Sequence, residues 1–158
     1  MPDMLVKLYD LPNVEPILAE VKASGIGIRR AMGLEKHLVC DWVRDNFDNP
    51  KWVSECDVAF SNKPIACYIA VEKENLIGFA VYDASSKGFF GPTGVLQQGR
   101  GQGIGKALLL AALEDMVHQG YGYAIIGAAG PVEFYQKTVG ATIIEQSSPG
   151  VYRGSLNY

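Results

Sequence analysis

Four glycines at alternate positions stand between a predicted strand and a predicted helix, and this glycine-rich junction constrains the fold more than any other feature of the chain. They are Gly99, Gly101, Gly103 and Gly105. Alternate glycines let the backbone curl so that successive N–H groups face one concavity, and the positive end of the helix dipole follows directly. Such a loop is suited to bind phosphate.

Two common phosphate-binding motifs do not fit this spacing. The pattern G-x-G-x-x-G, read from Gly101, ends on Lys106 instead of glycine. The P-loop pattern needs a glycine where Arg100 stands and a Ser or Thr where Ala107 stands. A nucleotide-binding domain of another class is therefore a weaker alternative. A plain connecting turn is also weaker, because glycines at a helix start lose conformational entropy without a packing return.

Hydrophobic periodicity predicts an antiparallel meander followed by alternating strands and helices. This order predicts an α+β domain whose central, mostly antiparallel mixed sheet has about seven strands and is flanked by helices. The turn at 24–27 is expected only to end the first helix. Expected strands are 5–9, 65–71, 76–82, 89–95, 123–126, 141–145 and 151–156, and expected helices are 16–23, 35–47, 51–60, 104–120 and 131–140.

Pro92 interrupts the expected strand 89–95. Proline lacks the N–H that a ladder hydrogen bond needs, so it is rare inside a regular central strand. We therefore expect a bulge or a splay of the sheet at this residue.

The composition of the chain is that of one soluble domain: 158 residues, 48% hydrophobic and 20% charged. The net charge of -3 argues against a nucleic-acid partner. Three widely spaced cysteines without a C-x-x-C pair argue against a disulfide framework or a metal site. The N-terminus has no apolar signal segment, and the longest apolar run, 107–113, is far shorter than a membrane span. We expect a cytoplasmic protein without a membrane partner.

Two motifs together resemble one family. The stretch from Arg100 to Gly105 resembles the R/Q-x-x-G-x-G/A motif of the GNAT acetyltransferases. The segment from Phe134 to Lys137, followed by Gly140, resembles that family's F-Y-x-K-x-G segment with one extra residue before the glycine. The resemblance implies a single GNAT-type domain over 1–158. In it, 1–62 is the variable, substrate-side part and 63–158 is the acetyl-CoA-binding core.

The resemblance also implies acetyl-CoA as the co-substrate and assigns residues to it. The edge of the strand that ends at Val95 would hold the pantetheine arm, and a backbone N–H of that strand would polarise the thioester carbonyl. The amides of the following loop would hold the pyrophosphate. The expected cofactor-binding residues are Val95, Leu96, Arg100, Gly101, Gln102, Gly103, Ile104, Gly105 and Lys106.

For catalysis, the resemblance makes Tyr135 the general acid that protonates the departing thiolate, which a phenol near pKa ~10 can do at neutral pH. The expected strand 89–95 carries no carboxylate, so Asp83 is the nearest candidate for the general base. Many family members carry an Asn seven residues before the Tyr, where this chain has Ala128. One side-chain contact to CoA is therefore expected to be missing.

The activity implied is transfer of an acetyl or short acyl group from acetyl-CoA to the primary amine of a small molecule, such as an amino sugar, a polyamine or an amino acid. The alternative is a non-catalytic sensor that binds acyl-CoA in the same fold. Homodimers are common in the family, so a homodimer is an expected assembly.

Overall fold

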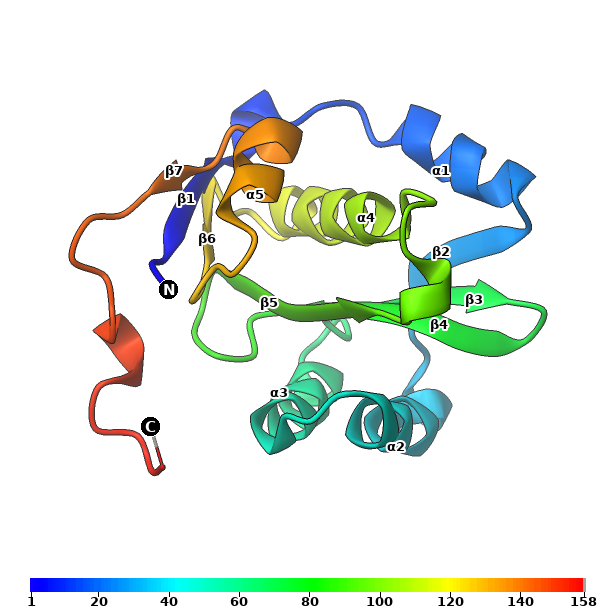
Figure 1. The fold of residues 1–158 in the computed structure, drawn as a ribbon, viewed down its shortest axis with the longest axis horizontal. Helices are drawn as coiled ribbons and strands as arrows, with labels where there is room; N and C mark the ends of the chain where they lie inside the picture. Colours follow the sequence, from blue (N-terminus) through cyan, green and yellow to red (C-terminus); the bar gives the residue numbers. More distant parts are fainter. Residues whose placement is uncertain (158) are drawn as a thin grey trace.

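The computed structural model describes residues 1–157, which form an open, seven-stranded sheet covered by helices on both faces (Figure 1). The strands are β1 (Met4–Lys7), β2 (Ile26–Arg30), β3 (Cys67–Glu72), β4 (Asn75–Tyr82), β5 (Phe89–Val95), β6 (Tyr123–Ile126) and β7 (Thr142–Ile143). The helices are α1 (Glu15–Ala23), α2 (Lys36–Asn46), α3 (Pro50–Ser61), α4 (Ile104–His118) and α5 (Val132–Val139).

The strand order is β2-β3-β4-β5-β6-β1-β7. Strands β5 and β6 pair in parallel, and every other neighbouring pair is antiparallel. The N-terminal strand β1 therefore lies inside the sheet, between β6 and β7, while the hairpin strands β3 and β4 lie toward the opposite edge. The predicted α+β class and the mixed, mostly antiparallel sheet are confirmed.

Two strand predictions are wrong. No strand forms over 151–156, where the chain makes a short 3-10 turn at Gly150–Tyr152 and further turns; Gly150 and Gly154 adopt positive φ there. The seventh strand is instead β2, where only a turn was expected. Its Ile26 is buried, and all its residues pair with β3, so tertiary pairing overrides the turn-favouring glycines around it. The strand predicted at 141–145 shortens to β7.

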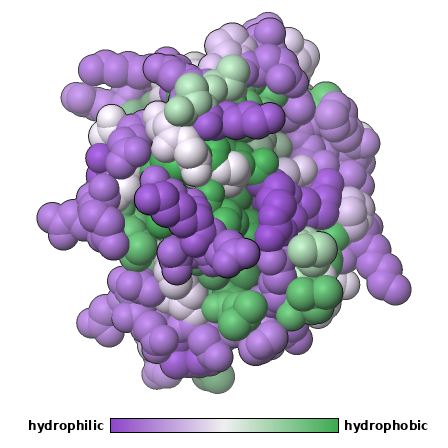
Figure 2. Space-filling view, turned by 90° about the vertical axis from the view of Figure 1, so that its right-hand side faces the viewer, coloured by the Kyte–Doolittle hydropathy of each residue, from purple (hydrophilic) through white to green (hydrophobic). Residues whose placement is uncertain are grey.

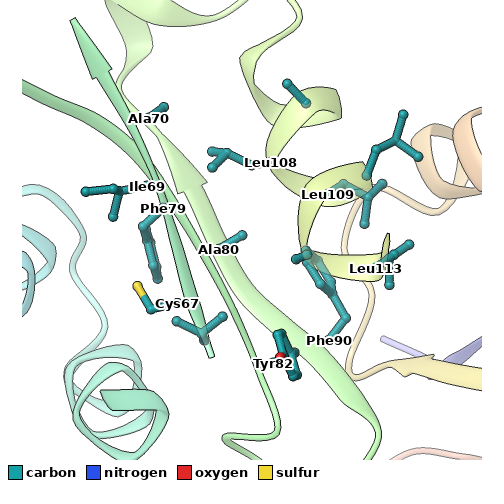
Figure 3. Packing of buried hydrophobic residues seen from close by; sticks show 14 of the residues in the cluster. Cys67, Ile69, Ala70, Phe79, Ala80, Tyr82, Phe90, Leu108, Leu109 and Leu113 are labelled. Atoms are coloured by element: carbon teal, nitrogen blue, oxygen red, sulfur yellow. The ribbon is translucent and has the colours of Figure 1, made fainter. Parts of the chain in front are cut away.

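The core has two layers, one on each face of the sheet. Leu108 of α4 lies against Ala80 of β4 on one face, while Phe79 and Ile69 point to the other face, toward α2 and α3 (Figure 3). This is the alternation expected of neighbouring strand residues. Helices α1, α4 and α5 lie on the first face and α2 and α3 on the second (Figure 1). Different parts of the chain therefore cover the two faces of the sheet.

A buried ion pair ties the edge of the sheet to α4. The Arg30 guanidinium donates to both carboxylate oxygens of Asp115, at 2.9 and 2.7 Å, and lies 5.2 Å from the centre of the Tyr68 ring. The Tyr82 hydroxyl also donates to Asp115. Burial alone would raise the pKa of Asp115, but these hydrogen bonds outweigh it and hold that pKa below its ordinary value.

The side that carries β2 and the β3–β4 turn exposes apolar surface among polar side chains. Figure 2 shows this side, with hydrophobic atoms at its middle surrounded by hydrophilic side chains.

No helix within residues 1–157 combines the length and the apolar character needed to cross a membrane. Within the same residues, no three His, Cys, Asp or Glu side chains gather in a way that could hold a metal ion.

Candidate active site

The sheet opens between β5 and β6. These strands pair only at Phe89 and Phe90, opposite Ile125 and Ile126. Beyond Phe90 the β5 strand runs on to Val95 without β6 beside it. The register between β4 and β5 also shifts between Phe90 and Thr93, the stretch that contains Pro92. The bulge or splay predicted at Pro92 is confirmed.

The free edge of β5 offers backbone groups to a ligand. The N–H of Leu96 donates to the carbonyl of Ile77 on β4 at 2.9 Å. Successive backbone groups of a strand point to opposite edges, so the N–H of Val95 points away from β4, into the gap left by β6. By the same alternation the N–H of Thr93 points there too. An extended chain could pair with this edge as an added strand does.

The glycine-rich loop continues directly from this edge into α4. Gly101 and Gly103 have φ of 84° and 79°, in the left-handed region that glycine adopts most easily. Gly103 is the N-cap of α4, and no side chain caps the helix. The first backbone N–H groups of a helix have no partner within it, so those at the start of α4 are available to an anion. Exposed Arg100 and Lys106 add positive charge.

The glycines of this loop have different surroundings. A Cβ added to Gly103 would lie 3.0 Å from Cδ1 of Ile17, so packing against α1 and the positive φ both require glycine there. A Cβ added to Gly105 would meet only Cγ2 of Val95, at 3.8 Å, and one added to Gly101 would meet nothing within 4 Å. At these two positions the space beside the backbone is open.

Tyr135 lies in α5 and is 5% exposed. Its hydroxyl makes no hydrogen bond within residues 1–157. No fully buried side-chain oxygen in this part of the chain lacks a partner, so the hydroxyl reaches accessible space. Burial raises the pKa of Tyr135 to about 12. The group therefore stays protonated at neutral pH and can donate a proton.

The loop after β6 is held by the N-terminus of the chain. Ala128 has a φ of 46°, and its N–H donates to the Asp3 carboxylate at 2.8 Å. Asp3 is 6% exposed, and its own N–H donates to Ser147 at 2.8 Å. Sequence reasoning noted the missing Asn side chain at 128 but did not predict this carboxylate. The Asp3 carboxylate holds this loop through the backbone N–H of Ala128, in place of an Asn side chain.

Asp83 lies at the end of β4, where both carboxylate oxygens accept hydrogen bonds. The N–H of Gly88 donates to one at 2.7 Å and the Tyr121 hydroxyl to the other at 2.7 Å. Burial and the bond to Asp83 raise the pKa of Tyr121 to about 12. Asp83 also lines a hollow of about 170 Å³ with the lysines Lys63 and Lys87.

A second carboxylate near β5 was missed by sequence reasoning. Glu55 of α3 is half-buried and accepts a hydrogen bond from the Ser85 hydroxyl in the β4–β5 connection. Burial raises the pKa of Glu55, and the bond from Ser85 lowers it by less. The available signal was its spacing: Trp52, Glu55 and Ala59 lie three and four residues apart, on one side of a helix.

The fold is shared with acetyltransferases of known structure. A glucosamine N-acetyltransferase region of a fungal multi-domain GH3 beta-N-acetylglucosaminidase matches with a TM-score of 0.73 and 17% identity, over 90% of this chain and 19% of that one. A GCN5-related N-acetyltransferase from Sphaerobacter thermophilus matches with a TM-score of 0.67 and 22% identity, over 90% and 48%. One from Kribbella flavida matches with a TM-score of 0.61 and 18% identity, over 90% and 53%.

This chain spans between about a fifth and a half of the length of these three proteins. No curated protein matches the sequence. The sequence profile described as "Acetyltransferase (GNAT) family" matches residues 32–141, which is more than half of the chain and includes β5, the glycine-rich loop and Tyr135. The chain therefore belongs to the GNAT family of acetyltransferases, which use acetyl-CoA as the acyl donor.

Proposed function

We propose that this chain transfers an acetyl or short acyl group from acetyl-CoA to the primary amine of a small molecule. The observation that carries the proposal is the continuity of two features. The β5 edge is free beyond Phe90, and it leads directly into the glycine-rich start of α4. The free edge of β5 would pair with an extended chain, and the start of α4 would bind an anion next to it. This order matches acetyl-CoA, whose extended thiol arm ends in a diphosphate.

The residues fit the two ends of acetyl-CoA. Val95 and Leu96 would hold the pantetheine arm, and the segment from Arg100 to Lys106 would hold the pyrophosphate through its backbone N–H groups and the positive end of α4. Bound acetyl-CoA would supply an activated thioester at the point where β5 and β6 separate.

The chain's own groups would then serve the transfer. A backbone N–H on the free edge of β5 would donate to oxygen where negative charge develops. Tyr135 would give its phenolic proton to the leaving thiolate. Asp83 stays a prediction for the base; both its carboxylate oxygens accept hydrogen bonds from within the protein.

An amino sugar is the first acceptor to test. The fungal protein of similar fold is described as a glucosamine N-acetyltransferase region, and a metagenomic protein of the same fold is described as an aminoglycoside acetyltransferase, with a TM-score of 0.52 and 17% identity over 73% of this chain and 88% of that one. Polyamines and amino acids should be tested as well, because any primary amine can attack a thioester once the amine has lost its proton.

In this proposal residues 63–158 hold acetyl-CoA and residues 1–62 contribute the acceptor side. The protein acts in the cytoplasm on a small molecule, alone or as a homodimer. Three buried, unpaired cysteines favour a reducing compartment.

Release of free thiol from acetyl-CoA across glucosamine, spermidine, amino acids and aminoglycosides tests the proposal, with calorimetry of acetyl-CoA binding alongside. Turnover with at least one amine is expected. Binding without turnover for every amine would favour the second candidate, an acyl-CoA sensor, which the absence of a carboxylate on β5 supports. A protein that does not bind acetyl-CoA would contradict both.

A further inference from the structure

We propose that Trp52 and Glu55 of α3 form the site that binds the ammonium group of the acceptor. This inference rests on the proposed function, because it takes the free edge of β5 as the place where the acetyl group is presented. It adds the residues that select a cationic acceptor and the face of the sheet from which that acceptor enters.

Trp52 lies under the last residues of β5. Helix α3 packs on β4 and β5, on the face opposite α4 (Figure 1). The Trp52 ring lies 5.3 Å from the ring of Phe47 and 5.9 Å from that of Phe79, between centroids. Phe47 in turn occupies the place of a side chain at Gly94, since an added Cβ there would lie 2.6 Å from the ring. This aromatic cluster therefore lies directly against β5.

Glu55 lies beside the loop that leads into the same strand. It is one turn from Trp52 on α3 and accepts its hydrogen bond from Ser85, four residues before the first residue of β5. The two α3 side chains thus flank the stretch of β5 in which the strand separates from β6. No salt bridge involves Glu55 within residues 1–157, and the nearby charge of Lys51 and the bond from Ser85 favour its carboxylate by less than burial disfavours it.

The C-terminal segment closes the same face. Phe90 points toward α4 (Figure 3), so Phe89 points to the α3 side. A Cβ added to Gly127, just beyond β6, would contact the Tyr152 hydroxyl and lie 2.9 Å from Phe89. The Lys51 Nζ reaches the carbonyl of Asn157 at 3.4 Å. Helix α3 and the C-terminal segment therefore border the separation point from two sides.

The chemistry of the pair matches an ammonium ion. The face of an indole ring attracts a cation, most strongly where water is excluded. A carboxylate beside it supplies charge-assisted hydrogen bonds. Glu55 is half-buried, so its pKa is raised by burial and only partly lowered by Ser85 and Lys51. A carboxylate that is poorly solvated gains more from a bound cation than an exposed one does.

Fluorescence of Trp52 tests the proposal without any turnover. The chain has two tryptophans, so Trp42→Phe leaves Trp52 as the reporter. In that variant, saturated with CoA, we expect glucosamine or spermidine to change the emission saturably and glucose to leave it unchanged. Adding Glu55→Gln, which keeps a partner for Ser85, should weaken amine binding at least about tenfold. The matched control Asp57→Asn, on the exposed side of α3, should bind as before.

A second readout separates binding from a structural effect. Glu55→Gln should raise KM for the cationic amines more than it lowers kcat. With hydroxylamine, which is uncharged at neutral pH, it should change neither. Glu55→Gln that binds each amine as tightly as the parent, or a Trp52 signal that responds to no amine, overturns the inference. Loss of acetyl-CoA binding in the parent protein would instead overturn the proposed function, since calorimetry measures that binding independently.

Discussion

The carboxylate of Asp3 accepts a hydrogen bond from the backbone N–H of Ala128 at 2.8 Å, across 125 positions of the sequence. The contact joins the residue that precedes β1 to the loop that follows β6, beside the point where β5 and β6 separate. Because Asp3 also holds Ser147 through its own N–H, one buried residue joins three segments around the candidate site.

Asp3→Ala should destabilise the protein by about 2 kcal/mol, because it removes a buried carboxylate and leaves the partly buried N–H of Ala128 without its charged acceptor. Unfolding in urea, followed by circular dichroism, measures the change. Asp10→Ala removes an exposed carboxylate nearby in sequence and should leave the midpoint almost unchanged. Equal midpoints for the two variants would show that the Asp3 contact contributes nothing to the loop.

Lys106→Glu should weaken acetyl-CoA binding at least about tenfold while the protein stays folded. Lys106 is the third residue of α4, where a glutamate favours the helix, so repulsion of the diphosphate is the expected effect. Lys7→Glu makes the same charge change on β1, next to the start of β6 and thus near the opposite end of α4. Calorimetry measures acetyl-CoA binding by both variants. Similar losses of affinity in the two would place the anion site elsewhere.

Gly103→Val is a poorer test of the same site. The added side chain would strain a φ of 79° and press on Ile17 of α1, so its effect on acetyl-CoA could not be separated from its effect on the fold.

Tyr135→Phe should lower kcat by roughly a hundredfold, the lower range for loss of a general acid, and should leave acetyl-CoA affinity nearly unchanged. Burial raises the pKa of Tyr135 to about 12, so the phenol stays protonated over the pH range in which acetyl transfer can be assayed. Tyr123→Phe, at an exposed position, is the control. Single-turnover rates compare the variants, and an unchanged rate in Tyr135→Phe would remove the general-acid role.

Asp115→Asn should destabilise the protein by about 3 kcal/mol at neutral pH, because it leaves the Arg30 guanidinium without its buried partner. The folded pKa of Asp115 is below its ordinary value, so the unfolded chain binds this proton more readily. The stabilisation is therefore present at neutral pH and is lost as pH falls below about 4, through the folded pKa. Urea midpoints between pH 7 and pH 3 should fall less steeply in Asp115→Asn; parallel curves would contradict this.

Elements with local signals could be predicted from the sequence. Strands β5 and β6 lie at their predicted residues because short apolar runs are bounded by turn residues. Strand β2 was missed because its evidence lies in pairing with β3, far away in the chain. The strand expected at 151–156 fails because Gly150, just before that segment, and Gly154, within it, take up positive φ.

In the candidate site, too, the features with a local sequence signal could be predicted and those set by distant contacts could not. The loop from Arg100 to Lys106 is contiguous, so its place between β5 and α4 could be predicted, and its binding of an anion stays a prediction. The carboxylates Asp3 and Glu55 act through contacts with residues 125 and 30 positions away, which no local pattern marks. Their roles follow from the topology that places β1 beside β6 and α3 beneath β5.

Mass spectrometry of an amine incubated with the protein and acetyl-CoA tests the central claim most directly. The account predicts that at least one primary amine of the panel gains a single acetyl group, with release of an equal amount of free CoA, and that Tyr135→Phe slows both together. Thiol release without any acetylated amine, or acetyl-CoA left intact with every amine, would contradict it.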